Sequence, residues 1–137
     1  MRPFTIALLL VAGLSGGALA QAPAGPLYVV THVDLAPPPA PPGATQADQN
    51  RLRAETGQRG LALLGEMAAG CSPAVGCLRF EVLQTVGAAN HLTMVSVWKD
   101  QAALEFFEGT ERVKSARARL APMLGSPFDQ RLHLLAH

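Results

Sequence analysis

The sequence predicts an α+β domain of the ferredoxin-like type, with the element order β-α-β-β-α-β and an antiparallel sheet. Three observations predict this class. Four short runs are rich in β-branched and aromatic residues or alternate between apolar and polar ones, as strands do. Two longer stretches carry apolar residues at helical spacing and begin after a capping residue. A short loop containing glycine separates the second and third strand-like runs, which favours a hairpin.

The first twenty residues are typical of a secretory signal peptide. Arg2 precedes an apolar run at 4–14, and small residues end at Ala20. The run is shorter than the roughly 20 residues that a membrane-spanning helix needs, so we favour cleavage after Ala20 over a retained anchor. We therefore expect a periplasmic or secreted protein without a stable membrane anchor, in which 21–26 is a flexible lead-in and 27–135 is one domain.

Charge and cysteine content exclude several classes of function. Removing Arg2 from the 11 basic residues leaves 10 against 10 acidic ones, so the basic surface that nucleic-acid binding requires is not expected. Cys71 and Cys77 are the two cysteines and flank a short turn. In an oxidising compartment such a pair favours a local disulfide, and further ligands at zinc-site spacing are missing, so no metal site is expected.

The first strand is expected at 27–34, followed by a proline-rich connection at 36–43. Alternation divides the strand into an apolar face and a more polar one, the latter carrying Tyr28, Val30, His32 and Asp34. The five prolines of the connection cannot continue a strand ladder and favour a stiff, extended segment. We interpret it as a spacer, with a ligand for a proline-recognition module as the alternative.

The first helix is expected at 47–69, capped by Thr45 with Asp48 in a capping box. Three internal glycines lower its intrinsic propensity by roughly 1 kcal/mol each relative to alanine. The helix must therefore depend on tertiary packing, and the glycines would let a neighbouring strand approach closely.

Two further strands are expected at 78–86 and 91–98, joined by a hairpin loop at 87–90. The third strand has two faces, and either could line a pocket. One face carries His91, Thr93, Val95 and Val97, and the other carries Leu92, Met94, Ser96 and Trp98.

Asp100 is expected to cap a second helix that runs to about Leu120, with Glu108 and Arg112 as a surface ion pair. A last strand at 128–135 carries Arg131 and His133 on one side. Both helices would cover one face of the sheet. The opposite face keeps apolar side chains that a small sheet cannot leave in water, so we expect a homodimer.

Three segments carry a resemblance to a known family: Gly76-Cys-Leu-Arg-Phe80, the strand end Val97-Trp98, and Trp98-Lys-Asp-Gln-Ala-Ala-Leu-Glu-Phe-Phe107. In these residues the chain resembles the antibiotic biosynthesis monooxygenase family, dimeric α+β barrels that include quinol monooxygenases and haem-degrading enzymes. The resemblance implies oxidation of a small aromatic or quinol-type compound by dioxygen, without flavin or metal. It also implies a dry aromatic pocket lined by Trp98, which matches the family tryptophan.

The sequence departs from the family pattern at three positions. Phe107 stands where a histidine is usual, Ser96 where an acidic residue is frequent, and Met94 where some members have asparagine. These replacements motivate an alternative, a non-catalytic ligand-binding or stress-associated dimer. Haem binding is a third and weaker hypothesis.

His32 is the candidate base for monooxygenase chemistry, since histidine titrates near neutral pH. The alternative is a histidine hydrogen-bonded at the sheet surface or in a dimer interface. Arg131 could bind an anionic substrate or be an ordinary solvated residue. The residues predicted to line the pocket are Trp98, Tyr28, Phe107, Met94, Ser96 and Arg131.

Overall fold

The computed structural model describes residues 25–136. The expected signal peptide and most of the expected lead-in lie outside the described residues. Within them, no helix is long and apolar enough to cross a bilayer. The helices and strands are β1 (Leu27–Asp34), α1 (Gln46–Ala68), β2 (Cys77–Thr85), β3 (Ala88–Trp98), α2 (Gln101–Glu108), α3 (Glu111–Leu120) and β4 (Asp129–Leu134). Two short 3-10 turns are η1 (Pro73–Val75) and η2 (Ala121–Met123).

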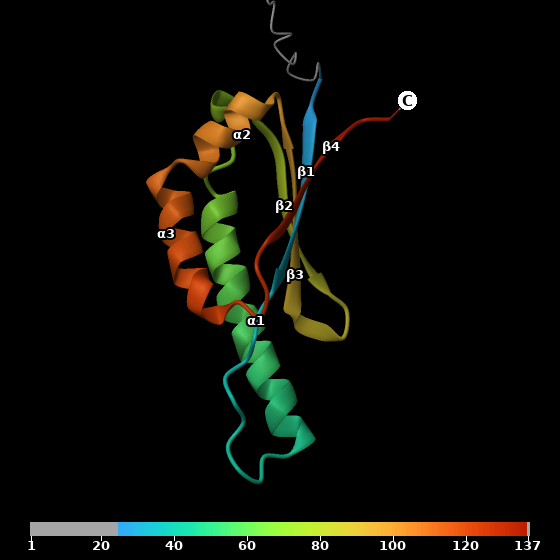
Figure 1. The fold of residues 1–137 in the computed structure, drawn as a ribbon, viewed down its shortest axis with the longest axis vertical. Coiled ribbons are helices and arrows are strands. Elements are labelled where there is room, and N and C mark those ends of the chain that lie inside the picture. Colours follow the sequence, from blue (N-terminus) through green and yellow to red (C-terminus); the bar gives the residue numbers. More distant parts are fainter. Residues whose placement is uncertain (1–24, 137) are drawn as a thin grey trace, which may run out of the picture.

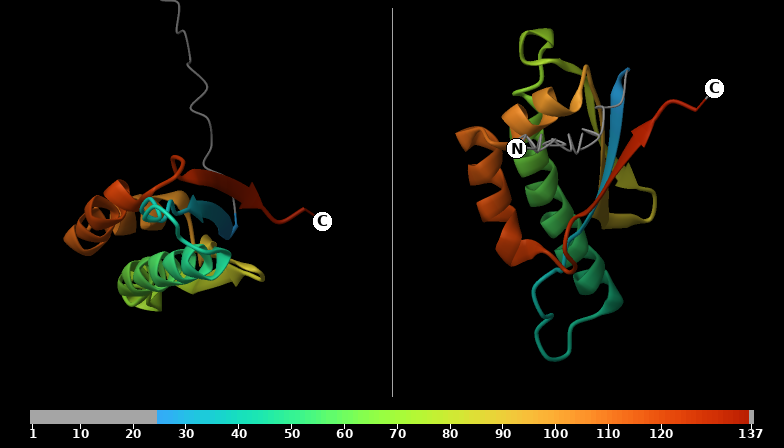
Figure 2. Two further views of the ribbon diagram at one scale, coloured as in Figure 1. Left: turned by 90° about the horizontal axis from the view of Figure 1, so that it is seen from below. Right: turned by 45° about the horizontal axis from the view of Figure 1, so that its top comes forward.

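The four strands form one antiparallel sheet in the order β2-β3-β1-β4. Figures 1 and 2 show the three helices on one side of this sheet, with the other side uncovered. This arrangement confirms the predicted ferredoxin-like fold. The core lies between the sheet and the helices, and Trp98, Leu92 and Val33 are among its fully buried side chains.

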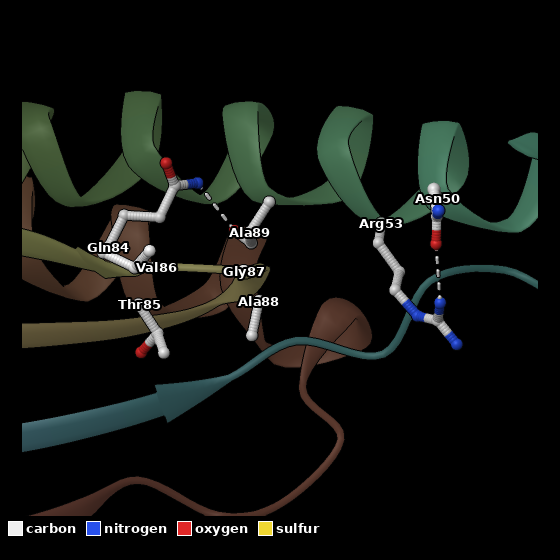
Figure 3. Close-up of a pocket in the computed structure, with 8 residues that line it drawn as sticks. All are labelled: Asn50, Arg53, Gln84, Thr85, Val86, Gly87, Ala88 and Ala89. Carbon is white, nitrogen blue, oxygen red and sulfur yellow. Dashed lines mark hydrogen bonds between the residues drawn. The ribbon is translucent and has the colours of Figure 1, made fainter.

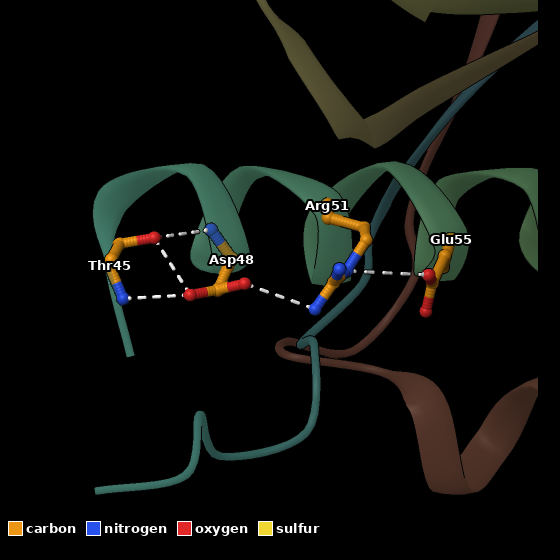
Figure 4. Close-up of polar contacts among 4 residues, drawn as sticks. All are labelled: Thr45, Asp48, Arg51 and Glu55. Atoms are coloured by element: carbon orange, nitrogen blue, oxygen red, sulfur yellow. Dashed lines mark hydrogen bonds and ion pairs between the residues drawn. The ribbon is translucent and has the colours of Figure 1, made fainter. Parts of the chain in front are cut away.

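Helix α1 begins with the capping box that the sequence predicts (Figure 4). The backbone N–H of Asp48 donates to the Thr45 hydroxyl at 3.2 Å, and the backbone N–H of Thr45 donates to the Asp48 carboxylate at 3.0 Å. The Thr45 hydroxyl also donates to the Asp48 carboxylate at 2.7 Å, and this hydrogen bond, followed by the one from the Thr45 backbone N–H, lowers the pKa of Asp48 from its ordinary value. Aspartate can therefore take the place of the usual glutamate in this cap.

Two of the helix glycines explain how α1 lies so close to the sheet. A Cβ on Gly57 would overlap the carbonyl of Ala89, and one on Gly60 would overlap the side chain of Leu35. Gly65 instead has open space around it. Close approach is thus required at Gly57 and Gly60 but not at Gly65.

The prediction of a single second helix is wrong. Helix α2 ends at Glu108, Gly109 follows, and Thr110 occupies the position before the separate helix α3, without a capping hydrogen bond from its side chain. Because the chain turns there, the helical spacing between Glu108 and Arg112 is lost and their predicted ion pair does not form. Glu108 pairs with Arg117 at 2.8 Å, while Arg112 donates to the carbonyl of Glu66.

The hairpin between β2 and β3 is tighter than predicted. Strand β3 extends back to Ala88, so only Val86 and Gly87 form the turn, and Gly87 adopts a φ of 81°. At the other end of β2, the predicted disulfide is present between Cys71 and Cys77, with the Cα atoms 5.1 Å apart. It joins the loop that follows α1 to the first residue of β2, which pairs with Trp98 of β3.

Candidate functional site

Three aromatic rings cluster between the sheet and helix α2. The ring centroid of Phe107 lies 4.7 Å from that of Trp98 and 5.9 Å from that of Phe80. The Asp100 carboxylate accepts from the backbone N–H of Ala103 at 2.8 Å and so starts α2 directly after β3. This cap turns the chain back over the sheet and brings Phe107 onto the indole.

The indole is held by a hydrogen bond as well as by packing. Trp98 Nε1 donates to the hydroxyl of Ser96 at 2.9 Å, and both residues are buried. Buried indole N–H groups need such a partner. Ser96 therefore fixes the orientation of Trp98, a role that its position on the same strand face permits.

A small cavity lies against these rings, with a volume of about 20 Å³. It has room for about one water molecule. Its walls come from all four strands and all three helices. The lining residues are Val29, Thr31, Met67, Phe80, Met94, Ser96, Trp98, Leu104, Phe107, Glu108, Arg117 and Gln130.

One end of the cavity is polar and brings together residues far apart in the sequence. Arg117 Nη2 donates to Glu108 Oε1 at 2.8 Å, and Gln130 Nε2 donates to the same oxygen at 3.1 Å. The guanidinium of Arg117 lies over the ring of Phe128, 5.7 Å from its centroid. Arg117 Nε is buried and has no hydrogen-bond partner among the described residues. The cavity is thus lined by an arginine whose guanidinium is held by Glu108 and whose Nε–H has no partner among the described residues.

The uncovered face of the sheet carries a different set of polar contacts. His32 Nδ1 lies 3.1 Å from the Thr93 hydroxyl, and His91 Nδ1 lies 2.7 Å from Asp34 Oδ1. The hydrogen bond from His91 is the main reason that the pKa of Asp34 lies below its ordinary value. Burial opposes this shift, and a hydrogen bond from Ser126 adds to it. His32 is thus hydrogen-bonded to Thr93 at the sheet surface, which matches the alternative to a catalytic role.

The predicted pocket residues are divided between the two faces. Trp98, Phe107, Met94 and Ser96 line the cavity on the helix-covered face. Strand pairing places Tyr28 opposite Val97, His32 opposite Thr93 and Arg131 opposite Val30, all on the uncovered face. The structure therefore does not bring His32, Tyr28 or Arg131 to Trp98, because alternate residues of a strand point to opposite sides.

Glu108, Arg117 and Gln130 were not among the predicted site residues. Glu108 follows Phe107 directly, and Arg117 follows the buried Ala116, so each lies beside an apolar helix stripe. This place beside buried residues is the sequence feature that could have identified them as site residues. Their mutual contact was hidden because it depends on the turn at Gly109 and on the position of β4 at the sheet edge.

Larger hollows lie at the surface. One of about 530 Å³ opens beside His32, and its lining residues are His32, Asp34, Thr85, Ala88, His91, Leu92, Thr93 and Asp129. The groove in Figure 3 lies between α1 and the β2–β3 hairpin and measures about 470 Å³. Its walls are mostly backbone and small side chains, and Arg53 is its one charged lining residue. Among the described residues, no group of three or more His, Cys, Asp or Glu side chains is placed to hold a metal ion.

Comparisons with known proteins agree with the fold. A crystal structure of an antibiotic biosynthesis monooxygenase has a TM-score of 0.62 and 16% identity, covering 81% of this chain and 99% of that one. Rv0793 from Mycobacterium tuberculosis has a TM-score of 0.62 and 15% identity, covering 82% and 96%. PA3566 from Pseudomonas aeruginosa has a TM-score of 0.55 and 24% identity, covering 81% and 96%. No curated protein matches the sequence.

The family model for antibiotic biosynthesis monooxygenases matches residues 46–119, more than half of the 137-residue chain. The matched region runs from the start of α1 to the last turn of α3 and includes Trp98, Phe107 and Arg117. It therefore contains five of the seven helices and strands that line the aromatic cavity: α1, β2, β3, α2 and α3. The chain belongs to the antibiotic biosynthesis monooxygenase family.

Proposed function

We propose that this protein binds a small aromatic or quinol-type compound in the cavity beside Trp98 and oxidises it with dioxygen without a bound cofactor. The observation that carries the proposal is the meeting of an aromatic wall with the unused N–H donor of Arg117. Phe107 and Trp98 offer the ring contacts that an aromatic substrate prefers. A guanidinium N–H stabilises a developing oxyanion by a charge-assisted hydrogen bond.

In this proposal the polar residues divide the chemistry between them. Glu108 is the one carboxylate among the lining residues and accepts the proton from the substrate hydroxyl. Arg117 Nε–H then donates to the resulting phenolate, whose electron-rich ring passes electrons to dioxygen. One oxygen atom replaces a ring hydrogen and becomes a carbonyl, the other leaves as water, and the phenol becomes a quinone, so that the substrate supplies all four electrons. His32 is not assigned a part, because it faces the other side of the sheet.

A substrate needs more room than the about 20 Å³ of the cavity. Gln130 forms part of the wall and belongs to β4, an edge strand that pairs with β1 alone. Most β4 side chains are exposed. We therefore propose that the substrate enters beside Gln130, displacing its hydrogen bond to Glu108.

Oxygen uptake with a panel of quinols and hydroxylated aromatics tests the proposal. We expect Arg117→Met to lower the rate by about 100-fold or more, the loss typical of one oxyanion donor. Arg119→Met is the matched control, since Arg119 is on the same helix and pairs with Glu66 at 2.7 Å away from the cavity. A rate that falls with His32→Ala but not with Arg117→Met would overturn the proposal.

A non-catalytic ligand-binding protein is the second candidate. It is favoured by Phe107, Ser96 and Met94, which line the cavity where family members carry ionisable or amide groups, so that no histidine reaches it. Trp98 is the single tryptophan and reports binding directly by its fluorescence. Quenching by a hydroxylated aromatic without oxygen uptake would support this candidate, and substrate turnover would exclude it.

Haem is not assigned to this site. Neither histidine nor cysteine lines the cavity, and its volume is far below that of a porphyrin. The residues present therefore do not fit a haem group, and no step of the proposed reaction passes through one. Addition of haem is expected to leave the Soret band of free haem unshifted.

We also propose a homodimer formed through the uncovered sheet face and an exported mature chain. The half-buried Val30 and Val95 contribute apolar surface to that face, and Leu83 is 49% exposed. One face of an antiparallel sheet is commonly solvated, but apolar side chains exposed together on that face mark an interaction surface. A monomer mass in sedimentation at micromolar concentration would contradict the dimer. A mature protein that does not begin at Gln21, or one found only in the cytoplasm, would contradict the export proposal.

A further inference from the structure

The proposed function makes no use of residues 36–42, the Ala-Pro-Pro-Pro-Ala-Pro-Pro segment between β1 and α1. Each proline fixes φ near −65°. Five residues of the segment directly precede a proline, which disfavours the helical conformation and favours the polyproline II conformation. The sequence thus restricts this segment to an extended helix with three residues per turn.

Both ends of the segment are anchored without help from the prolines. At its start, the backbone N–H of Ala36 donates to the Met123 carbonyl at 2.9 Å, next to a strand bridge between Leu35 and Leu124. At its end, the N–H of Ala44 donates to the Pro41 carbonyl at 3.0 Å, and the capping box of α1 follows (Figure 4). Both ends of the segment are therefore fixed, and the loss of conformational entropy when a partner binds it is small.

The segment presents its prolines outward. Pro38, Pro39, Pro41 and Pro42 are exposed, while Pro37 is half-buried against α1. Three residues per turn place Pro38 and Pro41 on one ridge. Among the described residues, no backbone hydrogen bond engages the carbonyls from Ala36 to Ala40. The ridge and its carbonyls are thus free for recognition.

A positive charge lies beside this ridge. Arg53 of α1 lines a crevice of about 120 Å³ together with Pro37, Pro38 and Ala40. Its Nη1 donates to the Asn50 side chain at 3.1 Å (Figure 3), and no carboxylate of the described residues pairs with it. By contrast, Arg51 on the same helix pairs with Asp48. The arrangement is a Pro-x-x-Pro ridge flanked by an available arginine.

We infer that residues 36–42 are a preformed ligand for a protein domain that binds polyproline II helices in an aromatic-lined groove. Pro38 and Pro41 fill neighbouring slots between aromatic side chains, and Arg53 meets a carboxylate at the edge of the groove. A spacer between β1 and α1 explains the stiffness of the segment. It does not explain an outward ridge with an arginine left without a carboxylate beside it.

The test uses the full protein and a purified SH3 domain that has an acidic residue beside its aromatic groove, as a probe of groove chemistry. The protein is titrated into the isotope-labelled domain and its groove resonances are followed by NMR. We expect saturable shifts, a loss of about tenfold or more in affinity for Pro38→Ala/Pro41→Ala, and a loss of about threefold to tenfold for Arg53→Ala. Arg59→Ala is the matched control, because Arg59 is exposed and lies farther along α1; we expect it to bind like the wild type.

Two results would overturn the inference. One is the absence of groove shifts at about millimolar protein, and the other is unchanged affinity of the double proline variant. Thermal unfolding of each variant shows whether it is folded, and Arg53→Ala tests the same contact without touching the prolines. Because the segment is remote from the cavity, oxygen uptake is expected to stay at the wild-type rate in all three variants, so this inference and the proposed function fail independently.

Discussion

The two faces of the sheet differ in how deeply their side chains are buried and in which polar groups they carry. The helix-covered face holds Trp98 and Phe107 in a buried cluster that ends in the Arg117 and Glu108 pair. The uncovered face holds histidines and carboxylates in partly exposed contacts such as His91 with Asp34. The uncovered face therefore carries more of the side chains that commonly take part in catalysis. The enclosed cavity nevertheless forms on the other face, from groups that the helices bring to it.

Substitutions on the two faces should differ most in their effect on the free energy of unfolding. Trp98→Ala removes a fully buried ring and should lower the free energy of unfolding by about 3–5 kcal/mol. Tyr28→Ala, on the uncovered face, should cost about 1 kcal/mol or less. Urea unfolding measures both. Equal losses would break the contrast, and a Tyr28→Ala loss that grows with protein concentration would show that a second copy covers its face.

The disulfide ties the helix-covered side together next to Trp98. It closes a loop with a sequence separation of 6, so the variant Cys71→Ala/Cys77→Ala should lose about 2 kcal/mol of unfolding free energy. Reductant should lower the unfolding free energy of the wild type by a similar amount and should leave that of the variant unchanged. A wild type that is equally stable with and without reductant would contradict this role.

Alanine substitutions of the α1 glycines test how closely that helix must approach the sheet. Gly57→Ala places a Cβ on the Ala89 carbonyl, and overpacking of about 1–3 kcal/mol outweighs the roughly 1 kcal/mol that alanine gains in helix propensity. The expected net loss is up to about 2 kcal/mol. Gly65→Ala meets open space and should gain up to about 1 kcal/mol. Denaturation midpoints of the two variants should shift in opposite directions, and a shared direction would refute this packing.

The smallest effect belongs to the uncovered face and depends on pH. The hydrogen bond from His91 lowers the pKa of Asp34, so the stability that this carboxylate contributes is present above its unfolded pKa of about 3.9 and is lost as pH falls through the folded value. Both side chains are nearly half exposed, which limits the contribution to less than about 1 kcal/mol.

Unfolding curves between about pH 2 and pH 6 check this expectation. Asp34→Asn should be less stable than wild type above about pH 4, and the difference should shrink on acidification. In a His91→Ala background the same substitution should have a smaller effect. A difference that stays constant with pH would show that Asp34 acts through its shape rather than its charge.

Much of the fold could be predicted from particular residues. Alternation in 27–34 and 91–98 identified the two faces of the central strands, and Thr45 and Asp100 located the helix starts. The helix break could not be predicted because Gly109 lies within an otherwise continuous helical pattern. Only the packing of Thr110, whose hydroxyl donates to the Phe107 carbonyl at 2.7 Å, shows that α2 ends there.

The sequence by itself determined the strands and their two faces, the caps, the disulfide and the family to which Trp98 points, because these depend on residues close together along the chain. The tertiary structure decided which face the helices cover, and so separated His32 from Trp98. It also assembled Glu108, Arg117 and Gln130, which lie on α2, α3 and β4. Their contact depends on the order of strands and on the angle between two helices, and no local pattern encodes either.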